Sequence, residues 1–477
     1  MKSIASVLSI IVLGFGLIGC PGSGGGGGGG STGVASGTVV YLADQNTAGV
    51  FELYLATSGT KLNPGLLAGR TVTSFALTPD ATAVIYIADQ DLDDVFELYR
   101  VNVATPGVST KLNGVLAPGG DVVEFVVTPD NSAVVYRADQ TIDEVFELYR
   151  TVFVGGANTK LNPPYVAGQE DVETFVVLPN SSGVIYRADQ NTDGVPELYR
   201  VLFATAPLND RLVAPPLAIT QKVGAFAATS DSANVVYIAN RPLLISNPDQ
   251  LFIVPAAGGS NIQLNGVLVA NGNVTGFAVT PDGLSVVYRA DQDFVGVFEL
   301  YRTVIVGLVN SKLNFPLTPG GDVTSFGVIP DNSGVVYIAD QTTDNVFELF
   351  RTVFSGGNSQ LNPPYVVGTE DVVDFALFPN GNGVVYRADQ TTDGINEIYL
   401  AVFGIPGTPQ LNPALGSGQN VSTYAVVPDS NSAVYRANQD IPAIVELYQT
   451  MFSSPGSSTK LNTPLVAGEN VANFAVR

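Results

Sequence analysis

One stretch of sequence decides the fold: it reads VVEFVVTPDN over residues 122–131, VVYRADQ over 134–140, VFELYR over 145–150 and TKLN over 159–162. Each piece is short and rich in β-branched and aromatic residues. Pro-Asp, Asp-Gly-like or Gly-Gly turns separate the pieces. This pattern predicts four short β-strands joined by tight turns.

The same four-strand unit repeats along the chain. The tyrosine of its second strand recurs every 45 to 51 residues, at Tyr41, Tyr86, Tyr136, Tyr186, Tyr237, Tyr288, Tyr337, Tyr386 and Tyr435. Four strands repeated at about 40 to 50 residues are the signature of a β-propeller, in which each unit is one blade. The sequence therefore predicts an all-β protein.

The two ends of the repeat region predict how the ring closes. The repeat region begins with a strand that matches the second strand of the unit, at residues 39–42, and ends with one that matches the first strand, at residues 471–476. Pairing of the C-terminal strand with the N-terminal strands would complete nine blades and leave no long unpaired edge. We therefore expect a nine-bladed ring, with eight blades plus a stray unit, or two smaller rings, as alternatives. A solenoid is disfavoured because it would need polar caps.

The unit resembles the TolB-like, or WD-repeat-like, propeller repeat. The match is best at Pro281-Asp282-Gly283, Val287-Tyr288, Asp291 and Glu299-Leu300-Tyr301. The resemblance covers nearly all of residues 37–477, and it implies a fold and not a reaction. The family's periplasmic namesake has an extra α/β domain and no lipid anchor, and this chain departs from it on both points.

The start of the chain resembles a bacterial lipoprotein precursor. Lys2 precedes an apolar run that ends in Leu17-Ile18-Gly19-Cys20, a match to the lipobox, and this run is too short for a spanning helix. The resemblance implies a signal peptide over residues 1–19 and lipid attachment to Cys20. Residues 20–36 contain seven consecutive glycines and are expected to be a flexible tether for the propeller at 37–477. Pro21, where an Asp would retain the protein at the inner membrane, implies a location at the outer membrane if the cell has one.

The composition excludes several classes of chemistry. The chain has 43 acidic and 21 basic residues, for a formal charge of −22, so a nucleic-acid backbone would be repelled. It has no histidine and one cysteine. These counts exclude a Ser-His-Asp triad, a histidine-ligated metal site, a thiolate zinc cluster and an internal disulfide.

Pairs of aspartates four residues apart are the sharpest candidates for a metal site. They lie in the predicted hairpin between the second and third strands, and the pairs are Asp89 and Asp93, Asp139 and Asp143, Asp189 and Asp193, Asp340 and Asp344, and Asp389 and Asp393. Calcium prefers several oxygen ligands on a loop, so calcium is the candidate ion. The alternative is that the first aspartate caps the turn through the backbone and the second shapes the bend.

The hairpins and the loops into the next blade are expected to emerge on one face of the ring. That face should be acidic, with Glu170, Asp171, Glu370 and Asp371 beside the aspartate pairs. The basic residues are expected elsewhere, within strands, where Glu147 is placed to pair with an arginine of the neighbouring strand. The longer, apolar hairpin of the fifth unit, with Leu243 and Leu244, is a candidate docking site for a partner.

Catalysis is disfavoured because the candidate carboxylates repeat around the ring, whereas a glycosidase needs one distinct pair. The chain has no tryptophan to stack on a sugar, and only Tyr165 and Tyr365 in the inter-blade loops could substitute. We predict a lipid-anchored cell-envelope protein that is not an enzyme, whose propeller binds a protein or a glycan. The alternatives are a structural surface or spacer module without a discrete ligand and, after it, an envelope hydrolase.

Overall fold

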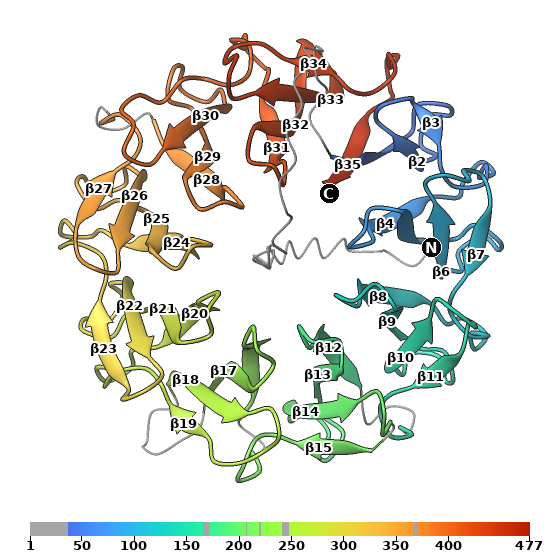
Figure 1. The fold of residues 1–477 in the computed structure, drawn as a ribbon, viewed down its shortest axis with the longest axis horizontal. Helices are drawn as coiled ribbons and strands as arrows, with labels where there is room; N and C mark the ends of the chain where they lie inside the picture. Colours follow the sequence, from blue (N-terminus) through green and yellow to red (C-terminus); the bar gives the residue numbers. More distant parts are fainter. Residues whose placement is uncertain (1–36, 166–170, 207, 219–220, 241–247, 366–369) are drawn as a thin grey trace, which may run out of the picture.

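The protein is a nine-bladed β-propeller. The computed structural model describes residues 37–165, 171–206, 208–218, 221–240, 248–365 and 370–477. Within these ranges the regular structure is all β-strand, and no helix there is long and apolar enough to cross a membrane. Nine antiparallel sheets stand in a ring around an open centre (Figure 1). The prediction of nine blades is confirmed, and the alternatives with eight blades or two rings are wrong.

The first two strands of each blade lie nearest the centre. The innermost strands, from blade 1 to blade 9, are β35 (Val471–Val476), β4 (Val72–Leu77), β8 (Val122–Val127), β12 (Val172–Val177), β16 (Val223–Ala228), β20 (Val274–Val279), β24 (Val323–Val328), β28 (Val372–Leu377) and β31 (Val421–Val426). The second strands are β1 (Val39–Ala43), β5 (Ala83–Ala88), β9 (Ala133–Ala138), β13 (Gly183–Ala188), β17 (Asn234–Asn240), β21 (Ser285–Ala290), β25 (Gly334–Ala339), β29 (Gly383–Ala388) and β32 (Ser432–Ile441).

The outer two strands complete each sheet. The third strands are β2 (Glu52–Leu55), β6 (Glu97–Asn102), β10 (Glu147–Val152), β14 (Glu197–Leu202), β18 (Asp249–Pro255), β22 (Glu299–Val304), β26 (Glu348–Val353), β30 (Glu397–Val402) and β33 (Ile444–Met451). The fourth strands are β3 (Thr60–Lys61), β7 (Ser109–Lys111), β11 (Asn158–Lys160), β15 (Asn209–Arg211), β19 (Ile262–Gln263), β23 (Val309–Lys312), β27 (Asn358–Gln360) and β34 (Thr459–Lys460). In blade 8 a single bridge between Tyr399 and Gln410 takes the place of the fourth strand.

The two ends of the repeat region close the ring, as predicted. β35 pairs with β1, and Phe474 lies opposite Tyr41 in the register. The N–H of Thr38 donates to the carbonyl of Arg477 at 2.7 Å, and the N–H of Arg477 donates back at 3.0 Å. Blade 1 is therefore built from both ends of the propeller.

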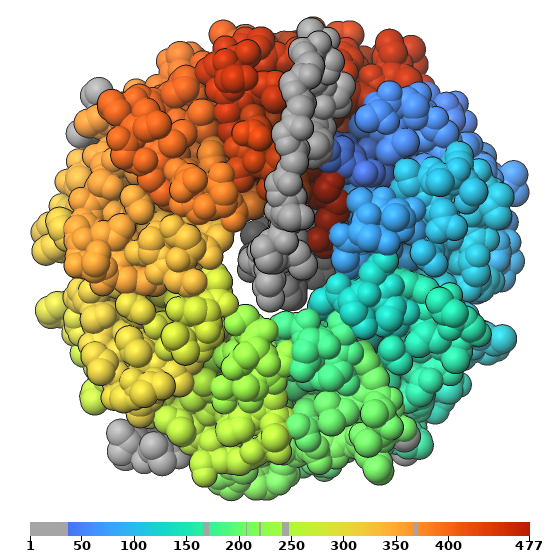
Figure 2. All heavy atoms as spheres, viewed as in Figure 1, coloured from blue at the N-terminus to red at the C-terminus, as the bar shows by residue number. Residues whose placement is uncertain are grey.

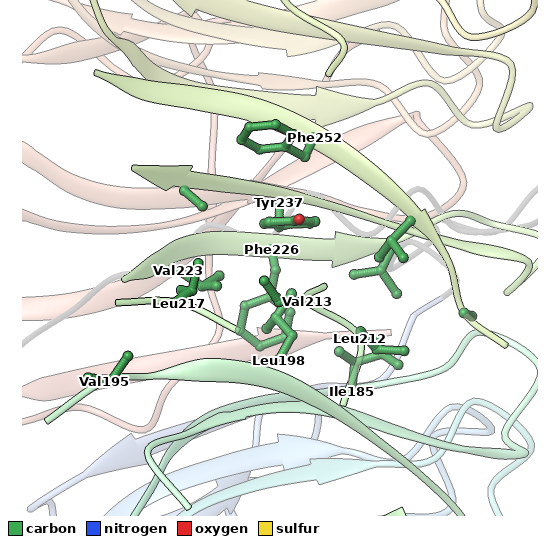
Figure 3. Packing of buried hydrophobic residues seen from close by; sticks show 14 of the residues in the cluster. Ile185, Val195, Leu198, Leu212, Val213, Leu217, Val223, Phe226, Tyr237 and Phe252 are labelled. Atoms are coloured by element: carbon green, nitrogen blue, oxygen red, sulfur yellow. The ribbon is translucent and has the colours of Figure 1, made fainter. Parts of the chain in front are cut away.

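The core lies between the blades. Nine clusters of buried apolar residues are present, one at each junction between neighbouring blades. Figure 3 shows the cluster between blades 4 and 5, where Leu198 faces Phe226 and Tyr237. Within each blade the repeated tyrosine of the second strand stacks on an aromatic residue of the third, as Tyr136 does on Tyr149 with centroids 5.5 Å apart. The blades converge on an opening at the centre of the ring (Figure 2).

The turn after each innermost strand explains its Pro-Asp motif. In blade 3 the Asp130 carboxylate accepts hydrogen bonds from the backbone and hydroxyl of Ser132. The residue between them, Asn131, has a φ of 57°. This left-handed conformation favours Asn or Gly, and Gly283 takes the same place in blade 6 with a φ of 70°.

Candidate functional site

The ring has two chemically different faces. Hairpins between second and third strands, such as residues 139–146, and connections into the next blade, such as 112–121, emerge at the same end of the antiparallel sheets. We call this end the hairpin face. The turns between first and second and between third and fourth strands, such as 128–132 and 153–157, make the turn face.

The first aspartate of each predicted pair ties its hairpin to the connection that enters the blade. In blade 4, Oδ1 of Asp189 accepts the backbone N–H of Asp171 at 2.8 Å, and Oδ2 accepts that of Gly194 at 3.0 Å. The equivalent Oδ1 bond is made by Asp89, Asp139, Asp340 and Asp389. We call these five residues the latch aspartates. Their carboxylates serve as acceptors for the backbone, as the alternative interpretation of the pairs expects.

The second aspartates lie at the exposed hairpin tips: Asp93, Asp143, Asp193, Asp344 and Asp393. Two of them pack over a connection, because a Cβ added to Gly119 would lie 3.0 Å from an Asp143 oxygen, and one added to Gly320 would lie 2.8 Å from Asp344. Among the described residues, no group of three or more His, Cys, Asp or Glu side chains is arranged to hold a metal ion. Calcium binding therefore stays a prediction.

Asp171 and Asp371 each bridge two blades. Oδ1 of Asp371 accepts the N–H of Phe347 in blade 7 at 2.7 Å, and the N–H of Asp371 donates to Asp389 in blade 8 at 2.7 Å. Burial raises the pKa of Asp371 above its ordinary value, and the carboxylates of Asp389, Asp340 and Asp393 add to this rise, while the Phe347 bond opposes it. The structure thus gathers Asp371 with latch aspartates of two neighbouring blades, as the sequence predicted.

Asp371→Asn should make the folded protein more stable at neutral pH. The folded state raises the pKa of Asp371, so its ionised form destabilises the fold, and this loss appears as the pH rises through that pKa. Other junctions carry Asn273 and Asn420 here and keep the Oδ1 acceptor. We expect a higher urea midpoint for the variant at pH 7 and no gain near pH 3, below the ordinary aspartate pKa of about 3.9. An equal gain at both pH values would contradict the electrostatic cause.

In five blades a third-strand glutamate pairs with a lysine of the fourth strand, whereas in blade 4 Glu197 pairs with Arg211 at 3.7 Å. Glu147 accepts the Tyr149 hydroxyl at 2.7 Å and forms an ion pair with Lys160 of β11. Successive side chains of a strand point to opposite faces, so Glu147 and Tyr149 share a face that Arg150 does not. Arg137 pairs instead with Glu124 of the innermost strand at 3.2 Å. The predicted pairing of Glu147 with an arginine is therefore wrong.

Some basic residues reach the hairpin face, which the sequence analysis did not expect. Lys111 lies 2.9 Å from the hairpin residue Asp91 and 2.6 Å from Glu97. Lys312 and Lys460 make the equivalent pairs with Asp293 and Asp440 at 2.7 Å. The fourth strand ends beside the hairpin, and its lysine neutralises part of the acidic charge there.

The two loop tyrosines are parts of the core and not platforms for a sugar. Tyr165 is 7% exposed, and its hydroxyl donates to Gln190 at 3.0 Å. Tyr365 is half-buried and donates to Gln390 at 3.3 Å. The expectation that these rings could substitute for tryptophan is wrong because their faces are packed between the blades.

On the turn face, arginines of the third strands stack on phenylalanines of the next blade. The guanidinium of Arg150 lies 4.3 Å from the ring centroid of Phe203, and that of Arg302 lies 3.9 Å from Phe354. Burial lowers the pKa of Arg150, and the charge of Asp130 opposes this change. These arginines brace the junctions between neighbouring blades, a role that the sequence analysis did not predict.

Sequence reasoning missed a groove on the hairpin face of blade 6. It has a volume of about 390 Å³ and lies between the hairpin that carries Phe294 and the connection that carries Leu317. The sequence contains a signal for this groove, because Val295 occupies the position that the second aspartate occupies in other hairpins. Four predicted site residues, namely Cys20, Glu170, Leu243 and Leu244, lie outside the described residues. Glu370 is half-buried beside Asp371.

Comparisons with known proteins show the fold. No family model and no curated protein sequence matches the chain. A eukaryotic initiation factor superposes with a TM-score of 0.56 at 10% identity, covering 91% of this chain and 98% of that one. Dipeptidyl peptidase 4 of Porphyromonas gingivalis superposes with a TM-score of 0.55 at 10% identity, covering 82% and 60%.

A TolB structure is also among the similar ones, with a weaker superposition. TolB of Acinetobacter baumannii has a TM-score of 0.31 at 15% identity, covering 58% of this chain and 63% of that one. At about 10% identity, the superpositions on the initiation factor and on the peptidase show a shared architecture and carry no information about activity. The chain is therefore a β-propeller whose function has to be argued from its own residues.

Proposed function

We propose that this protein is a lipid-anchored, non-catalytic scaffold of the cell envelope, whose hairpin face binds a basic protein or a glycan. One observation is the main support for the binding role. The repeated buried carboxylates are engaged by the backbone, whereas the hairpin tips present the exposed carboxylates of Asp93, Asp143, Asp193, Asp344 and Asp393. An acidic rim of this kind attracts cationic groups over several ångströms.

The arrangement of the carboxylates favours binding over catalysis. An acid–base pair in an enzyme consists of two groups whose environments push their pKa values apart. Here the same latch recurs in several blades, and the carboxylates of Asp139, Asp189, Asp340 and Asp389 each hold two chain segments in place. We infer that evolution of a reaction would require one blade to depart from this role.

The anchor is proposed from Cys20 and the glycine-rich segment after it. A flexible tether over residues 20–36 would have a root-mean-square span of about 20–25 Å, enough to let the ring tilt above the membrane. Replacing Cys20 with Ala should abolish labelling by radioactive palmitate and move the protein from the membrane fraction to the soluble fraction. Unchanged membrane association of the variant would contradict the anchor.

The binding face is tested by a photo-cross-linking residue at one exposed position of each face, in cells that make the protein. Thr192 marks the hairpin face, and Val154, which is 91% exposed, marks the turn face. The proposal expects a defined adduct from position 192, weakened by salt, and none from position 154. Adducts from neither position would instead favour the spacer module.

Calcium is tested by the thermal unfolding of the protein. An ion that binds the folded state raises the melting temperature by mass action. Because both oxygens of Asp189 already accept backbone bonds, the turn-forming interpretation expects the same melting temperature in chelator, in calcium and in magnesium. A rise of several degrees with calcium alone would make the hairpin aspartates ligands in addition to latches.

A further inference from the structure

Blade 6 departs from the repeat at the tip of its hairpin. Blades 4 and 7 carry a threonine and then an aspartate there, Thr192-Asp193 and Thr343-Asp344. Blade 6 carries Phe294 and Val295, which are 68% and 58% exposed. This hairpin therefore lacks the carboxylate and exposes two adjacent large apolar side chains, where the hairpins of blades 2 and 3 expose one, Leu92 and Ile142.

Phe294 forms one wall of the groove on this blade. The hairpin contributes Phe294 and Val297, and the connection into blade 7 contributes Pro316, Leu317 and Pro319. The volume of about 390 Å³ falls within the range of about 300–1,000 Å³ that is typical of ligand pockets. The groove therefore has the lining and the size to take one or more apolar side chains.

Three polar side chains of the groove, Asn314, Lys312 and Glu299, are already engaged. Oδ1 of Asn314 accepts the N–H of Leu300 at 2.8 Å, and its Nδ2 donates to the carbonyl of Phe315 at 3.0 Å. Lys312 lies 2.6 Å from Glu299 and 2.7 Å from Asp293. A sugar is recognised through directional hydrogen bonds, and this lining offers few groups for them, so apolar contact is the main source of affinity.

The rim of the groove is negatively charged. Asp293 and Glu299 share the single charge of Lys312. Asp344 of blade 7 lies against Gly320, which lines the groove, and within the described part of the chain it forms no ion pair. The whole chain carries a formal charge of −22. Charge complementarity therefore selects a cationic ligand and repels an anionic one.

We propose that this groove binds a positively charged peptide segment of a partner protein, which places a bulky apolar side chain beside Phe294 and a basic group beside Asp344. This inference rests on the proposed binding role of the hairpin face. It narrows that role to a site on blade 6 and to a peptide ligand. Buried aromatic side chains supply much of the energy of such contacts, so Phe294 is the anchor of the site.

The test measures binding of three labelled synthetic peptides by fluorescence anisotropy. The first has three leucines between two pairs of lysines, the second has serines in place of the leucines, and the third has glutamates in place of the lysines. We expect the first to bind, and Phe294→Thr to weaken it by about tenfold or more. Asp344→Asn should weaken it at about 20 mM salt and less so at about 200 mM.

Two matched comparisons control for misfolding and for the loss of any exposed apolar side chain. Phe294→Thr restores the residue found at Thr192, Thr343 and Thr392, so this hairpin should still fold, and an unchanged melting temperature verifies it. Leu92→Thr makes the same kind of change at the equivalent tip of blade 2, where Leu92 is 60% exposed, and should alter the affinity by less than about twofold.

Other outcomes overturn the inference in distinguishable ways. Suppose that wild type and Phe294→Thr bind the leucine peptide equally, but that a variant with Asn at Asp93, Asp143 and Asp193 does not bind it. This result would reject the groove as the binding site and would support binding by the acidic hairpin tips. Equal binding by all these variants would reject both. Binding of the serine peptide as tightly as the leucine peptide would reject the apolar anchor. Concentration-dependent dimers of wild type that Phe294→Thr abolishes would assign the groove to a second copy of the chain.

Discussion

Removal of residues 471–477 should lower the melting temperature by more than about 10 °C or leave the protein insoluble. These residues form β35, the innermost strand of blade 1, in which Phe474 lies opposite Tyr41. Val471 is fully buried in the cluster between blades 9 and 1. The loss of its apolar contacts and of the ladder hydrogen bonds should cost on the order of 10 kcal/mol.

Relocating the strand separates ring closure from simple truncation. The backbones of Thr38 and Arg477 are hydrogen-bonded to each other, so residues 470–477 can be placed before Thr38 through a short turn like that at 128–132. This permuted chain should recover the melting temperature of the wild type, measured by circular dichroism. A truncated chain that melts like the wild type would show that blade 1 does not depend on β35.

The fold could be predicted because its signals are local and repeated. The short runs of β-branched and aromatic residues, the Pro-Asp turns and the repeated tyrosine, such as Tyr136, each depend on neighbours within a few positions. Nine repetitions of a weak pattern also reveal a period that a single copy would not. Ring closure was predictable for the same reason, since the strand that ends the region has the sequence of the strand that its start lacks.

The roles of the site residues were harder to predict because they depend on contacts between blades. A calcium ligand and a backbone acceptor both require an oxygen, so the spacing of Asp189 and Asp193 fits either role. The backbone N–H of Asp171, which makes Asp189 a backbone acceptor in the structure, comes from the connection out of another blade. Similarly, the partner of Glu147 depends on which face of β10 it shares, and Lys160 becomes its neighbour only when β11 pairs with β10.

The groove on blade 6 shows a different limit. Phe294 and Val295 are visible as a break in the repeat, but a break in a loop is also expected from neutral drift. Only the position of the connection, with Pro316 and Leu317 opposite the hairpin, turns two exposed apolar residues into a groove. The sequence analysis singled out the long hairpin of the fifth unit instead, because length is easier to recognise than a substitution at constant length.

Asp139→Ala should be the most damaging single substitution on the hairpin face. Oδ1 of Asp139 accepts the N–H of Asp121 and its Oδ2 accepts that of Glu144 at 3.0 Å, and the side chain is 3% exposed. Alanine would leave both partly buried donors without this acceptor, at a cost of about 2–5 kcal/mol in the free energy of unfolding. Urea unfolding, monitored by tyrosine fluorescence, measures this change.

Asp143→Ala is the matched control, because it removes the same chemical group from the exposed tip of the same hairpin and should change the stability by less than about 0.5 kcal/mol. If Asp139 held a metal ion, chelator would destabilise the wild type and leave Asp139→Ala unchanged. If Asp139 is only a latch, the difference in stability between the two proteins should be the same with and without chelator.

The free energy of unfolding of Asp139→Asn should fall between those of Asp139→Ala and Asp143→Ala. In blade 9 the natural Asn438 keeps the Oδ1 bond, to Asn420, but its Nδ2 donates to the carbonyl of Pro442 in a hairpin of different shape. In blade 3 the same Nδ2 would instead meet the N–H of Glu144, so the substitution keeps one half of the latch and loses the other.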